Sequence, residues 1–361
     1  MKNLKIFKNS RVIVTGHTGF KGSWLTAWLK ILGANVMGIS LKPNTSPSHF
    51  VVSKINKEIK DVRLDIRNRK KLEKKIISFK PDFVFHLAAQ ALVGISYKNP
   101  VTTWESNVIG TLNILESLRK LKKKCNVVII TSDKCYFNKE VRYGYKESDI
   151  LGGKDPYSGS KAAAEILIKS YINSFFSKQK NISIATARAG NVIGGGDWAE
   201  NRIIPDCVRS WSKNKKATLR NPNATRPWQH VLEAVGGYLW LAVNLKFNKK
   251  IHGESFNFGP NLSREYSVLD LVKTISRFWK KVSWKKITKN KSSFYESELL
   301  RLNCNKAKKI LKWKTVLKFD ESIKLVADWY YEYYFGKENI INITTKQIKK
   351  YQHLMTKRRI K

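Results

Sequence analysis

Acidic residues are scarce in this chain of 361 residues: 27 aspartates and glutamates stand against 69 lysines and arginines, a formal net charge of +42. A large positive charge favours nucleic-acid binding when arginines and aromatic residues cluster together. Here the excess is mostly lysine, spread along the whole chain beside asparagine and isoleucine, as codon bias alone can produce. We therefore expect no specific nucleic-acid partner, although a positive field would attract a phosphorylated substrate.

Cysteine is also rare: Cys125, Cys135, Cys207 and Cys304 are the whole set, and none forms a Cys-x-x-Cys pair. This spacing favours free thiols over a disulfide framework or a zinc site, so we expect no metal. No apolar run approaches the roughly 18 residues that span a bilayer, and the N-terminus leads into a strand without an apolar signal segment. We expect a cytoplasmic protein with no membrane partner.

A glycine-rich loop joins the first predicted strand to the first predicted helix. An apolar strand is expected over 11–15, Gly16, Gly19 and Gly22 follow at Gly-x-x-Gly-x-x-Gly spacing, and a helix is expected over 23–32. Glycine lets the backbone approach a pyrophosphate closely, while a helix N-terminus supplies free N–H groups and a positive dipole end. In this strand–helix context the loop predicts dinucleotide binding.

The acidic residue that usually ends the second strand of a dinucleotide-binding domain is missing here. The strand predicted over 35–40 ends at Ser40, and Lys42 follows two residues later. Lys42 could face the 2′-phosphate of NADP or be a solvated surface lysine, so this segment leaves NAD and NADP both open. After the third strand, Asp65 is a candidate for binding the adenine amine or, alternatively, for capping the helix that begins near Asn68.

Strands and helices alternate through the first half of the chain. Apolar runs at 83–86, 127–130 and 182–187 predict buried parallel strands, and helical patterns over about 101–122 and 157–177 lie between them. This order predicts an α/β fold: a Rossmann-type doubly wound parallel sheet with a smaller C-terminal substrate-binding lobe.

The predicted domains follow from this pattern and from the loop-rich character of the second half. We expect a dinucleotide-binding domain over 1–190, with returning segments from about 226–260, and a substrate lobe mainly over 191–340. The remaining residues, 341–361, are basic and only weakly periodic, and we expect them to form a C-terminal tail with a helix and a solvated end.

The segment Thr131–Lys161 contains the candidate groups for proton transfer. Ser132 follows a buried strand, and Tyr157 and Lys161 are four residues apart, so they share one face of the predicted helix. A lysine one turn from a phenol favours the phenolate and lowers the pKa of the tyrosine. A hydroxyl, a phenol and a lysine arranged in this way can take a proton from an alcohol. His86, by contrast, is expected to be a hydrogen-bonded core histidine.

Together these motifs resemble the extended short-chain dehydrogenase/reductase family. Ser132-Asp133-Lys134 is similar to the motif of the sugar-nucleotide 4,6-dehydratases in that family, with serine where the pattern has threonine. The runs at 18–24, 188–198 and 224–231 resemble the members that act on CDP-glucose, and the likeness extends from about residue 8 to about residue 335. The motifs that carry the family resemblance are the loop after Thr15, His86-Leu87-Ala88-Ala89-Gln90 and Tyr157-x-x-x-Lys161.

The resemblance implies a lyase that dehydrates CDP-glucose with NAD as its cofactor. Tyr157 would take the proton of the sugar 4-hydroxyl, and the C4 ketone would make the C5 proton acidic. Lys134 would remove that proton, and Asp133 would protonate the departing 6-hydroxyl. Hydride return to C6 would give CDP-4-keto-6-deoxyglucose, an intermediate toward the deoxysugars of O-antigen and other bacterial surface polysaccharides. A homodimer through a bundle of the two long helices is also implied.

The same resemblance, with the polar segments of the second half, gives a set of candidate site residues. The catalytic residues are Ser132, Asp133, Lys134, Tyr157 and Lys161. The cofactor-binding residues are Gly16, Gly19, Phe20, Gly22, Asp65, Leu87, Ala88, Ala89, Tyr157 and Lys161. The substrate-binding candidates are Asn191, Arg202, Arg220, Arg226 and Arg301, since arginine makes bidentate contacts with phosphate.

Structural and functional alternatives accompany these assignments. Arg301 could form a surface ion pair with Glu298, and Asp133 and Lys134 could form an ion pair that closes a strand. Another sugar-nucleotide 4,6-dehydratase or a 4-epimerase would share the loop and the tyrosine–lysine pair, but an epimerase has no use for Asp133 and Lys134. A non-catalytic nucleotide- or RNA-binding Rossmann protein is more distant, because the intact set with Tyr157 argues against it.

Overall fold

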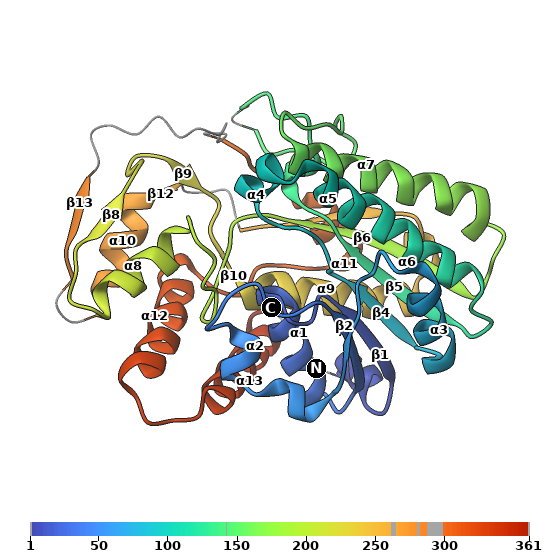
Figure 1. Cartoon of the computed structure of the whole chain (residues 1–361), viewed down its shortest axis with the longest axis horizontal. Coiled ribbons are helices and arrows are strands. Elements are labelled where there is room, and N and C mark those ends of the chain that lie inside the picture. The colour runs from blue at the N-terminus through green and yellow to red at the C-terminus, as the bar shows by residue number, and fades with distance from the viewer. Residues whose placement is uncertain (1, 142, 261–264, 280–281, 287–298, 360–361) are drawn as a thin grey trace.

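The computed structural model describes residues 2–141, 143–260, 265–279, 282–286 and 299–359, and a seven-stranded sheet forms its centre (Figure 1). The strands lie in the order β3-β2-β1-β4-β5-β6-β11, and every pairing is parallel. In that order they are Lys60–Arg63, Asn35–Ser40, Arg11–Thr15, Phe83–His86, Cys125–Ile130, Ile182–Ala189 and Ser255–Phe258. The predicted doubly wound α/β fold is confirmed, and its strand order reverses beside β1, where such folds bind their ligands.

Both faces of this sheet carry apolar side chains, and helices pack against each face. Successive residues of a strand point to opposite faces, so Val12 and Val14 join one core while Ile13 joins the other. The strand β5 is divided between the two cores in the same way. Burial on both faces explains why these strands read as continuous apolar runs in the sequence.

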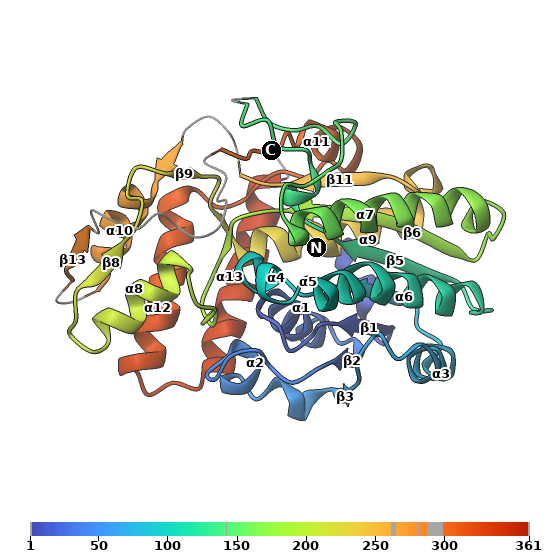
Figure 2. The same cartoon turned by 45° about the horizontal axis from the view of Figure 1, so that its top comes forward.

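Two layers of helices enclose the sheet (Figure 2). On one face lie α3 (Arg69–Phe79), α6 (Gly110–Arg119) and α7 (Pro156–Tyr171), whose apolar residues share a core with Ile13. On the other face lie α1 (Phe20–Ile31) and α9 (Val231–Phe247). Both α9 and β11 come from the second half of the chain and return to the sheet.

The long helix expected over about 101–122 runs without interruption through residues 100–119 and contains a π-helical turn. It consists of α5 (Pro100–Trp104), a π-helical turn at Glu105–Ile109 and α6. The wider turn places the side chain of Asn107 against the loop after β4, where its amide accepts from Gln90 N at 2.8 Å and donates to Ser160 Oγ at 2.8 Å. The π-helical turn therefore coincides with a tertiary contact with α7 that periodicity alone does not predict.

A smaller lobe lies to one side of the sheet (Figure 1). It contains three two-stranded ribbons, β7–β10, β9–β12 and β8–β13, with short helices packed around them. Its elements are β7 (Val192–Ile193), α8 (Ile203–Trp211), β8 (Ala217–Leu219), β9 (Thr225–Arg226), β10 (Gln229–His230), β12 (Tyr266–Ser267), α10 (Val268–Ser276), β13 (Trp284–Lys286) and α12 (Phe319–Phe335).

Short elements connect these layers. They are η1 (Lys2–Phe7), α2 (His49–Val52), η2 (Ile55–Glu58), α4 (Val93–Lys98), η4 (Asp133–Cys135), η5 (Ile172–Phe176), η6 (Lys249–Ile251) and α11 (Asn305–Leu311). Among the described residues, none of the helices combines the length and the apolar character needed to cross a membrane.

The C-terminal segment forms the helix that was expected there, but this helix packs on the domain over most of its length. It is α13 (Ile340–Arg359), a helix of 20 residues that contacts α1 and α12. Ile343, Ile348 and Tyr351 are buried along one face, and the Tyr351 hydroxyl donates to Glu233 Oε2 at 2.8 Å. A buried charge-assisted hydrogen bond and an apolar stripe hold this segment on the domain despite its many lysines.

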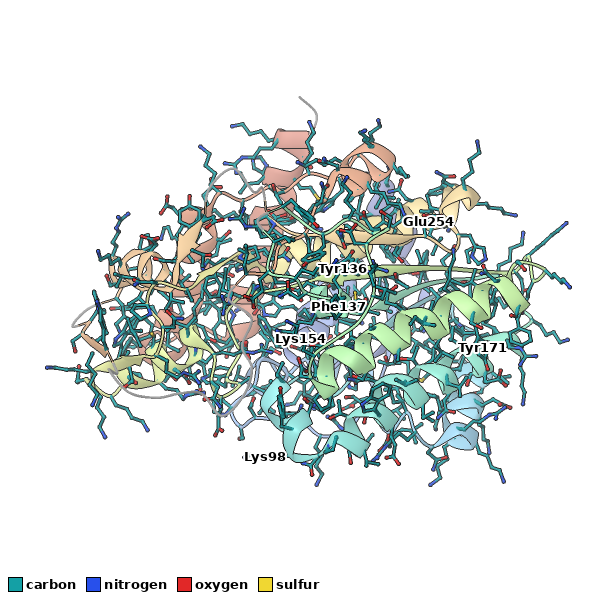
Figure 3. All side chains as sticks on the ribbon, turned by 90° about the horizontal axis from the view of Figure 1, so that it is seen from above. Lys98, Tyr136, Phe137, Lys154, Tyr171 and Glu254 are labelled. Atoms are coloured by element: carbon teal, nitrogen blue, oxygen red, sulfur yellow. The ribbon has the colours of Figure 1, made fainter. Side chains whose placement is uncertain are left out.

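Side chains that end in nitrogen project around the whole outline of the molecule in the view from above (Figure 3). In this view the positive charge is not gathered on one side. Tyr136 and Phe137 lie alongside α7, and Tyr171 marks the far end of that helix. The segment that contains Tyr136 follows β5. The carboxyl end of β5 and the start of α7 therefore lie close together.

Candidate active site

The glycine-rich loop forms a close-fitting cradle at the end of β1. Gly16 has a φ of +74°, and a Cβ atom there would lie 2.6 Å from the backbone nitrogen of Ala88. A Cβ on Gly22 would collide with the carbonyl oxygen of Gly16. Gly19 is the N-cap of α1, and as a glycine it has no side chain that could cover the first backbone N–H groups of the helix. A backbone this bare at a helix N-terminus fits a dinucleotide pyrophosphate.

The loop after β4 lies directly beside this cradle. Thr15 Oγ1 accepts a hydrogen bond from Ala88 N at 3.2 Å, and the half-buried Leu87 and Ala89 flank that contact. His86 is held between Thr15 Oγ1 at 2.7 Å and Thr111 Oγ1 at 3.0 Å. Burial and the charge of a nearby lysine lower the pKa of His86 to about 3. The prediction of a hydrogen-bonded core histidine is confirmed.

Ser132, Tyr157 and Lys161 come together at the end of β5. Ser132 caps the short helix η4 by accepting from the Lys134 backbone at 3.2 Å. Asp155 caps α7 by accepting from Ser158 N at 2.9 Å, which fixes the start of the helix. Tyr157 and Lys161 are 7% and 6% exposed, and the phenol is hydrogen-bonded to Ser132. The structure thus assembles the three groups that the sequence placed 29 residues apart.

The pKa of Tyr157 differs from the expectation. Burial raises it to about 12, while the hydrogen bond with Ser132 and the charge of Arg202 oppose that rise. The amine of Lys161 has its own pKa lowered to about 8, by burial first and by the charge of Lys21 second. The expected lowering by Lys161 is wrong for the folded chain, because removal of the phenol from water outweighs the neighbouring charges.

Asp133 and Lys134 have different surroundings. The Asp133 carboxylate is 5% exposed and accepts from Ser132 Oγ at 3.0 Å, whereas the Lys134 side chain is half-buried. Within the described part of the chain, the Lys134 amine forms no ion pair with Asp133. The alternative of an ion pair that closes a strand is therefore not what the structure contains.

A methyl group at Gly190 should impair turnover, because a Cβ atom there would collide with the carboxylate of Asp133. The carboxylate must shift, and a displacement of about 1 Å at a catalytic group costs roughly 100-fold in rate. We expect Gly190→Ala to lower kcat by about 10- to 100-fold with little change in KM. The matched control is Gly259→Ala, whose Cβ would meet Cys304 Sγ at an ordinary 3.5 Å. Equal kcat values for the two variants would contradict this reading of Gly190.

Lys21 is a site residue that the sequence reasoning missed. Its pKa is lowered to about 8 by burial and by Arg202, while Asp133 opposes the shift. Its charge also lowers the pKa of Lys161. Lys21 therefore lies close to both halves of the catalytic set, and its position inside the glycine-rich loop was the available signal.

Replacing Lys161 by methionine should stabilise the fold near neutral pH. The folded pKa is about 8, against a usual 10.5, so below pH 8 the folded chain bears the full cost of a buried charge. As pH rises from 8 toward 10.5, the folded amine is already neutral and the cost disappears. We expect Lys161→Met to raise the unfolding free energy by up to about 3 kcal/mol near pH 7 and by less near pH 10. Denaturant unfolding at both pH values measures this, with the exposed Lys42→Met as control; a gain independent of pH would contradict it.

Two of the predicted substrate-binding arginines lie in the smaller lobe, and one of them reaches the catalytic set. Arg202 precedes α8, donates to Asp197 Oδ2 at 2.6 Å, and is close enough to lower the pKa of Tyr157. Arg220 follows β8 and donates to the carbonyl oxygen of Asn201 at 3.2 Å. Arg202 is thus brought to the reacting groups, while Arg220 supports the backbone beside it.

Arg226 and Arg301 each contact the segment around β12. Arg226 is the pairing partner of Tyr266, and Arg301 forms an ion pair with Glu265, the preceding residue. Glu298, the alternative partner considered for Arg301, lies outside the described residues. We call these two arginines the second cationic group. Their partners, Tyr266 and Glu265, differ from Asp197, the partner of Arg202.

Asn191 and Asp65 have local roles in the structure. Asn191 has a φ of +45°, a region that asparagine tolerates, and its carbonyl accepts from Gln229 N at 3.2 Å. The Asp65 carboxylate is bound by Arg67, with Arg67 Nε at 3.0 Å. The N-cap of α3 is Asn68, so the alternative that Asp65 caps this helix is wrong.

Comparison with known proteins adds a family match and several similar chains. The family model described as GDP-mannose 4,6 dehydratase matches residues 13–326. The CDP-glucose 4,6-dehydratase of Salmonella typhimurium is 40% identical over 362 residues, which cover 99% of this chain and 100% of that protein.

Solved structures show the same fold. The epimerase Mth375 from Methanothermobacter thermautotrophicus has a TM-score of 0.77 at 22% identity and covers 96% of this chain and 97% of its own. The dTDP-glucose 4,6-dehydratase of Bacillus anthracis, solved in complex with NAD, has a TM-score of 0.70 at 22% identity over 90% of this chain and 97% of its own. At this identity, the likeness supports the fold alone.

Proposed function

This chain belongs to the GDP-mannose 4,6 dehydratase family, and on that premise we propose that it is a hydro-lyase that converts CDP-glucose into CDP-4-keto-6-deoxyglucose. The observation that carries the proposal is the packing of Asp133 against Ser132, beside Tyr157 and Lys161. An alcohol oxidation alone needs only the last three groups. A buried carboxyl group next to them, in its protonated form, supplies the proton donor that elimination also requires.

The residues divide the reaction into oxidation, elimination and reduction. The cradle at Gly16 and the loop at Ala88 would hold NAD, which when bound would supply the hydride acceptor for C4 and the hydride donor for C6. Tyr157 accepts the proton of the 4-hydroxyl while hydrogen-bonded to Ser132. Lys134 removes the C5 proton, and Asp133 protonates the 6-hydroxyl, which leaves as water. Lys134 then returns its proton to C5 as C6 is reduced. Tyr157 has now gained one proton and Asp133 has lost one, so exchange of that proton through solvent restores both groups for the next turnover.

The arginines of the smaller lobe suit the diphosphate of such a substrate. Arg202 lies beside the catalytic tyrosine, while Arg226 and Arg301 form the second cationic group. We assign Arg226 and Arg301 to the nucleotide diphosphate, with Asn191 beside the substrate and Arg202 nearest the sugar. Guanidinium groups bind phosphate oxygens through paired hydrogen bonds, so they supply affinity without taking part in proton transfer.

Incubation of the purified protein with CDP-, dTDP-, UDP- and GDP-glucose tests this function. We expect the alkaline absorbance of a 4-keto-6-deoxy sugar with CDP-glucose and little with the others. An epimerase would give the C4 epimer and no keto product, which would contradict the proposal. Repeating the assay with cofactor-stripped protein should show a preference for NAD; a preference for NADP would assign Lys42, which is exposed beside Ser40, to the 2′-phosphate.

We also propose a homodimer through the face made by α5, the π-helical turn and α7. These elements contact one another, and large apolar side chains on them face solvent: Val101 is 70% exposed, Trp104 43% and Ile109 45%. Together with α6 they lie side by side along one flank of the molecule (Figure 2). An exposed apolar face on adjacent helices is typical of a self-association surface.

Charged substitutions on this face should separate the dimer. We expect the double variant Val101→Glu and Trp104→Glu to sediment as a monomer while the unaltered protein sediments as a dimer. The control is Phe247→Glu at the end of α9, where the side chain is 68% exposed but lies on the other helical layer. Analytical ultracentrifugation decides the matter, and a double variant that remains dimeric would contradict the proposed surface.

The cysteines support a cytoplasmic location. Cys125, Cys135, Cys207 and Cys304 are all free thiols and all buried. A protein without disulfides among its described cysteines suits a reducing compartment, where the nucleotide sugar would also be available.

A further inference from the structure

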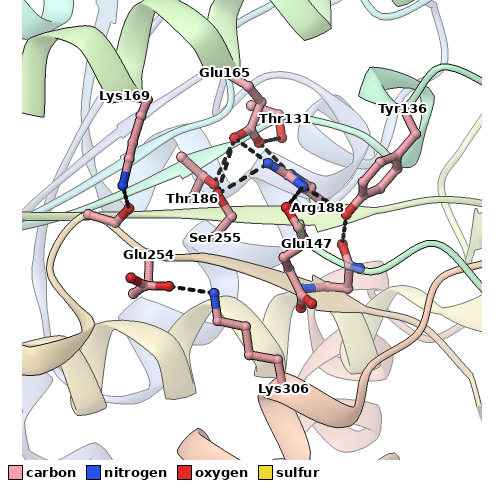
Figure 4. Close-up of polar contacts among 12 residues, drawn as sticks. Thr131, Tyr136, Glu147, Glu165, Lys169, Thr186, Arg188, Glu254, Ser255 and Lys306 are labelled. Carbon is pink, nitrogen blue, oxygen red and sulfur yellow. Dashed lines mark hydrogen bonds and ion pairs between the residues drawn. The ribbon is translucent and has the colours of Figure 1, made fainter. Parts of the chain in front are cut away.

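A buried ion pair between Arg188 and Glu165 lies beside Thr131 and Tyr136, the residues that flank the catalytic segment (Figure 4). Arg188 comes from β6 and Glu165 from α7, and their side chains are only 4% and 3% exposed. Arg188 Nε and Nη2 donate to the two carboxylate oxygens of Glu165, each at 2.9 Å. This fork-to-fork arrangement fixes both the distance and the orientation of the two groups.

The pair holds both ends of the segment that contains the catalytic residues. Thr131 Oγ1 donates to Glu165 Oε1 at 2.5 Å, and Arg188 Nη1 donates to the Tyr136 hydroxyl at 2.8 Å. The Tyr136 hydroxyl in turn donates to Asn257 Oδ1 at 2.8 Å. Ser132, Asp133 and Lys134 all lie between these two anchored residues. The segment is therefore clamped at residue 131 and at residue 136.

The same pair is also rigidly connected to the helix that contains the catalytic tyrosine. Glu165 is one turn beyond Lys161 and two turns beyond Tyr157 on α7. Burial by itself raises the pKa of Glu165, but Arg188 and the threonine hydroxyls lower it below its usual value. Both members thus keep their charge, and the clamp between helix and segment stays intact.

We propose that Arg188 and Glu165 are a positioning pair for the dehydration. The pair sets the distance between Ser132, Asp133 and Lys134 on the loop and the Tyr157–Lys161 pair on α7. This inference rests on the proposed function, because it assigns the loop to elimination and the helix to oxidation. The two steps use the same sugar ring, so the two sets of groups must keep a fixed separation.

Stability alone does not account for this arrangement. A buried ion pair is weak evidence for stability, since apolar residues of similar volume often stabilise a core equally well. A groove of about 1020 Å³ borders the pair, with both Arg188 and Glu165 in its wall. Water from that groove could compete for the hydrogen bonds of Arg188. However, Nε and Nη2 of Arg188 already donate to Glu165, and Nη1 donates to the Tyr136 hydroxyl.

Two mild substitutions test the proposal without leaving a buried charge unpaired. Tyr136→Phe removes the hydroxyl that Arg188 holds, and Thr131→Val removes the hydroxyl that Glu165 holds. Thr131→Ser keeps that hydroxyl and should restore activity. The matched control is Tyr351→Phe, which also deletes a buried tyrosine hydroxyl bound to a charged group, but on α13.

We expect Tyr136→Phe and Thr131→Val each to lower kcat by about 10-fold or more while KM changes by less than about twofold. Tyr351→Phe should keep the kcat of the unaltered protein, even if its melting temperature falls by as much as that of Tyr136→Phe or Thr131→Val. Amide hydrogen exchange of the peptide covering 131–137 should accelerate in Tyr136→Phe and not in Tyr351→Phe.

Two results would overturn the positioning role: a kcat in Tyr136→Phe equal to that of the unaltered protein, or the same loss of kcat in Tyr351→Phe. Failure of the proposed function has a different signature. In that case the unaltered protein gives no keto product from CDP-glucose. The exchange measurement then still decides whether the pair clamps the segment, since it needs no substrate.

Discussion

Replacing Tyr157 by phenylalanine should lower kcat for CDP-glucose by about 10²–10⁴-fold and leave binding of the nucleotide sugar nearly unchanged. The phenol is 7% exposed and hydrogen-bonded to Ser132, and the buried Lys161 lies one turn further along α7. Its oxygen acts only when the 4-hydroxyl loses its proton, so its removal costs transition-state binding and little ground-state affinity. The aromatic ring stays, and with it the packing at the start of α7.

The measurement is kcat and KM for the dehydration together with the affinity for CDP-glucose by titration calorimetry. Tyr238→Phe is the matched control. Tyr238 is a fully buried tyrosine on α9 whose hydroxyl has no hydrogen-bond partner among the described residues. It is also close enough for Tyr157 and Asp133 to raise its pKa further above the usual value, after burial. Equal losses of binding and turnover in Tyr157→Phe would show that the phenol holds the ground state.

The parts of this site that the sequence predicted are those set by local spacing. Gly16, Gly19 and Gly22 lie between a strand and a helix, and that context alone determines where a phosphate can approach. Tyr157 and Lys161 share a helical face because four residues make about one turn. The apolar runs of β4 and β5 identify buried strands because both of their faces are covered. Each inference needs only neighbours within a few residues.

The parts that the sequence did not predict depend on residues far apart in the chain. Lys21 is 112 residues before Asp133, yet the fold brings their charges together. Gly190 follows β6, and only the structure shows that the Asp133 carboxylate occupies the space beside it. The pKa of Tyr157 followed burial rather than the nearest charge. Arg202 of the smaller lobe and Tyr238 of α9 both lie near Tyr157, and helical spacing carries no information about either.

Lys134→Met should separate oxidation from elimination. Methionine keeps the length of the side chain and removes its basic nitrogen, while Tyr157, Lys161 and Ser132 stay in place. The variant should still oxidise C4, which a borodeuteride quench would record as deuterium at C4 of the recovered sugar. It should exchange the C5 hydrogen with deuterated water about 10²–10⁴-fold more slowly and should yield little 6-deoxy product.

Asp133→Asn should give the complementary pattern, because it removes the acid for the 6-hydroxyl and leaves the base. C5 exchange should then persist while loss of the 6-hydroxyl slows by about 10²–10⁴-fold. Two variants at adjacent positions, similar in size to the residues they replace, thus block opposite halves of one elimination. Should Lys134→Met exchange its C5 hydrogen at the normal rate, Lys134 is not the base. Lys21 then becomes the candidate, because its amine is close enough to Asp133 to respond to that charge and has a pKa of about 8.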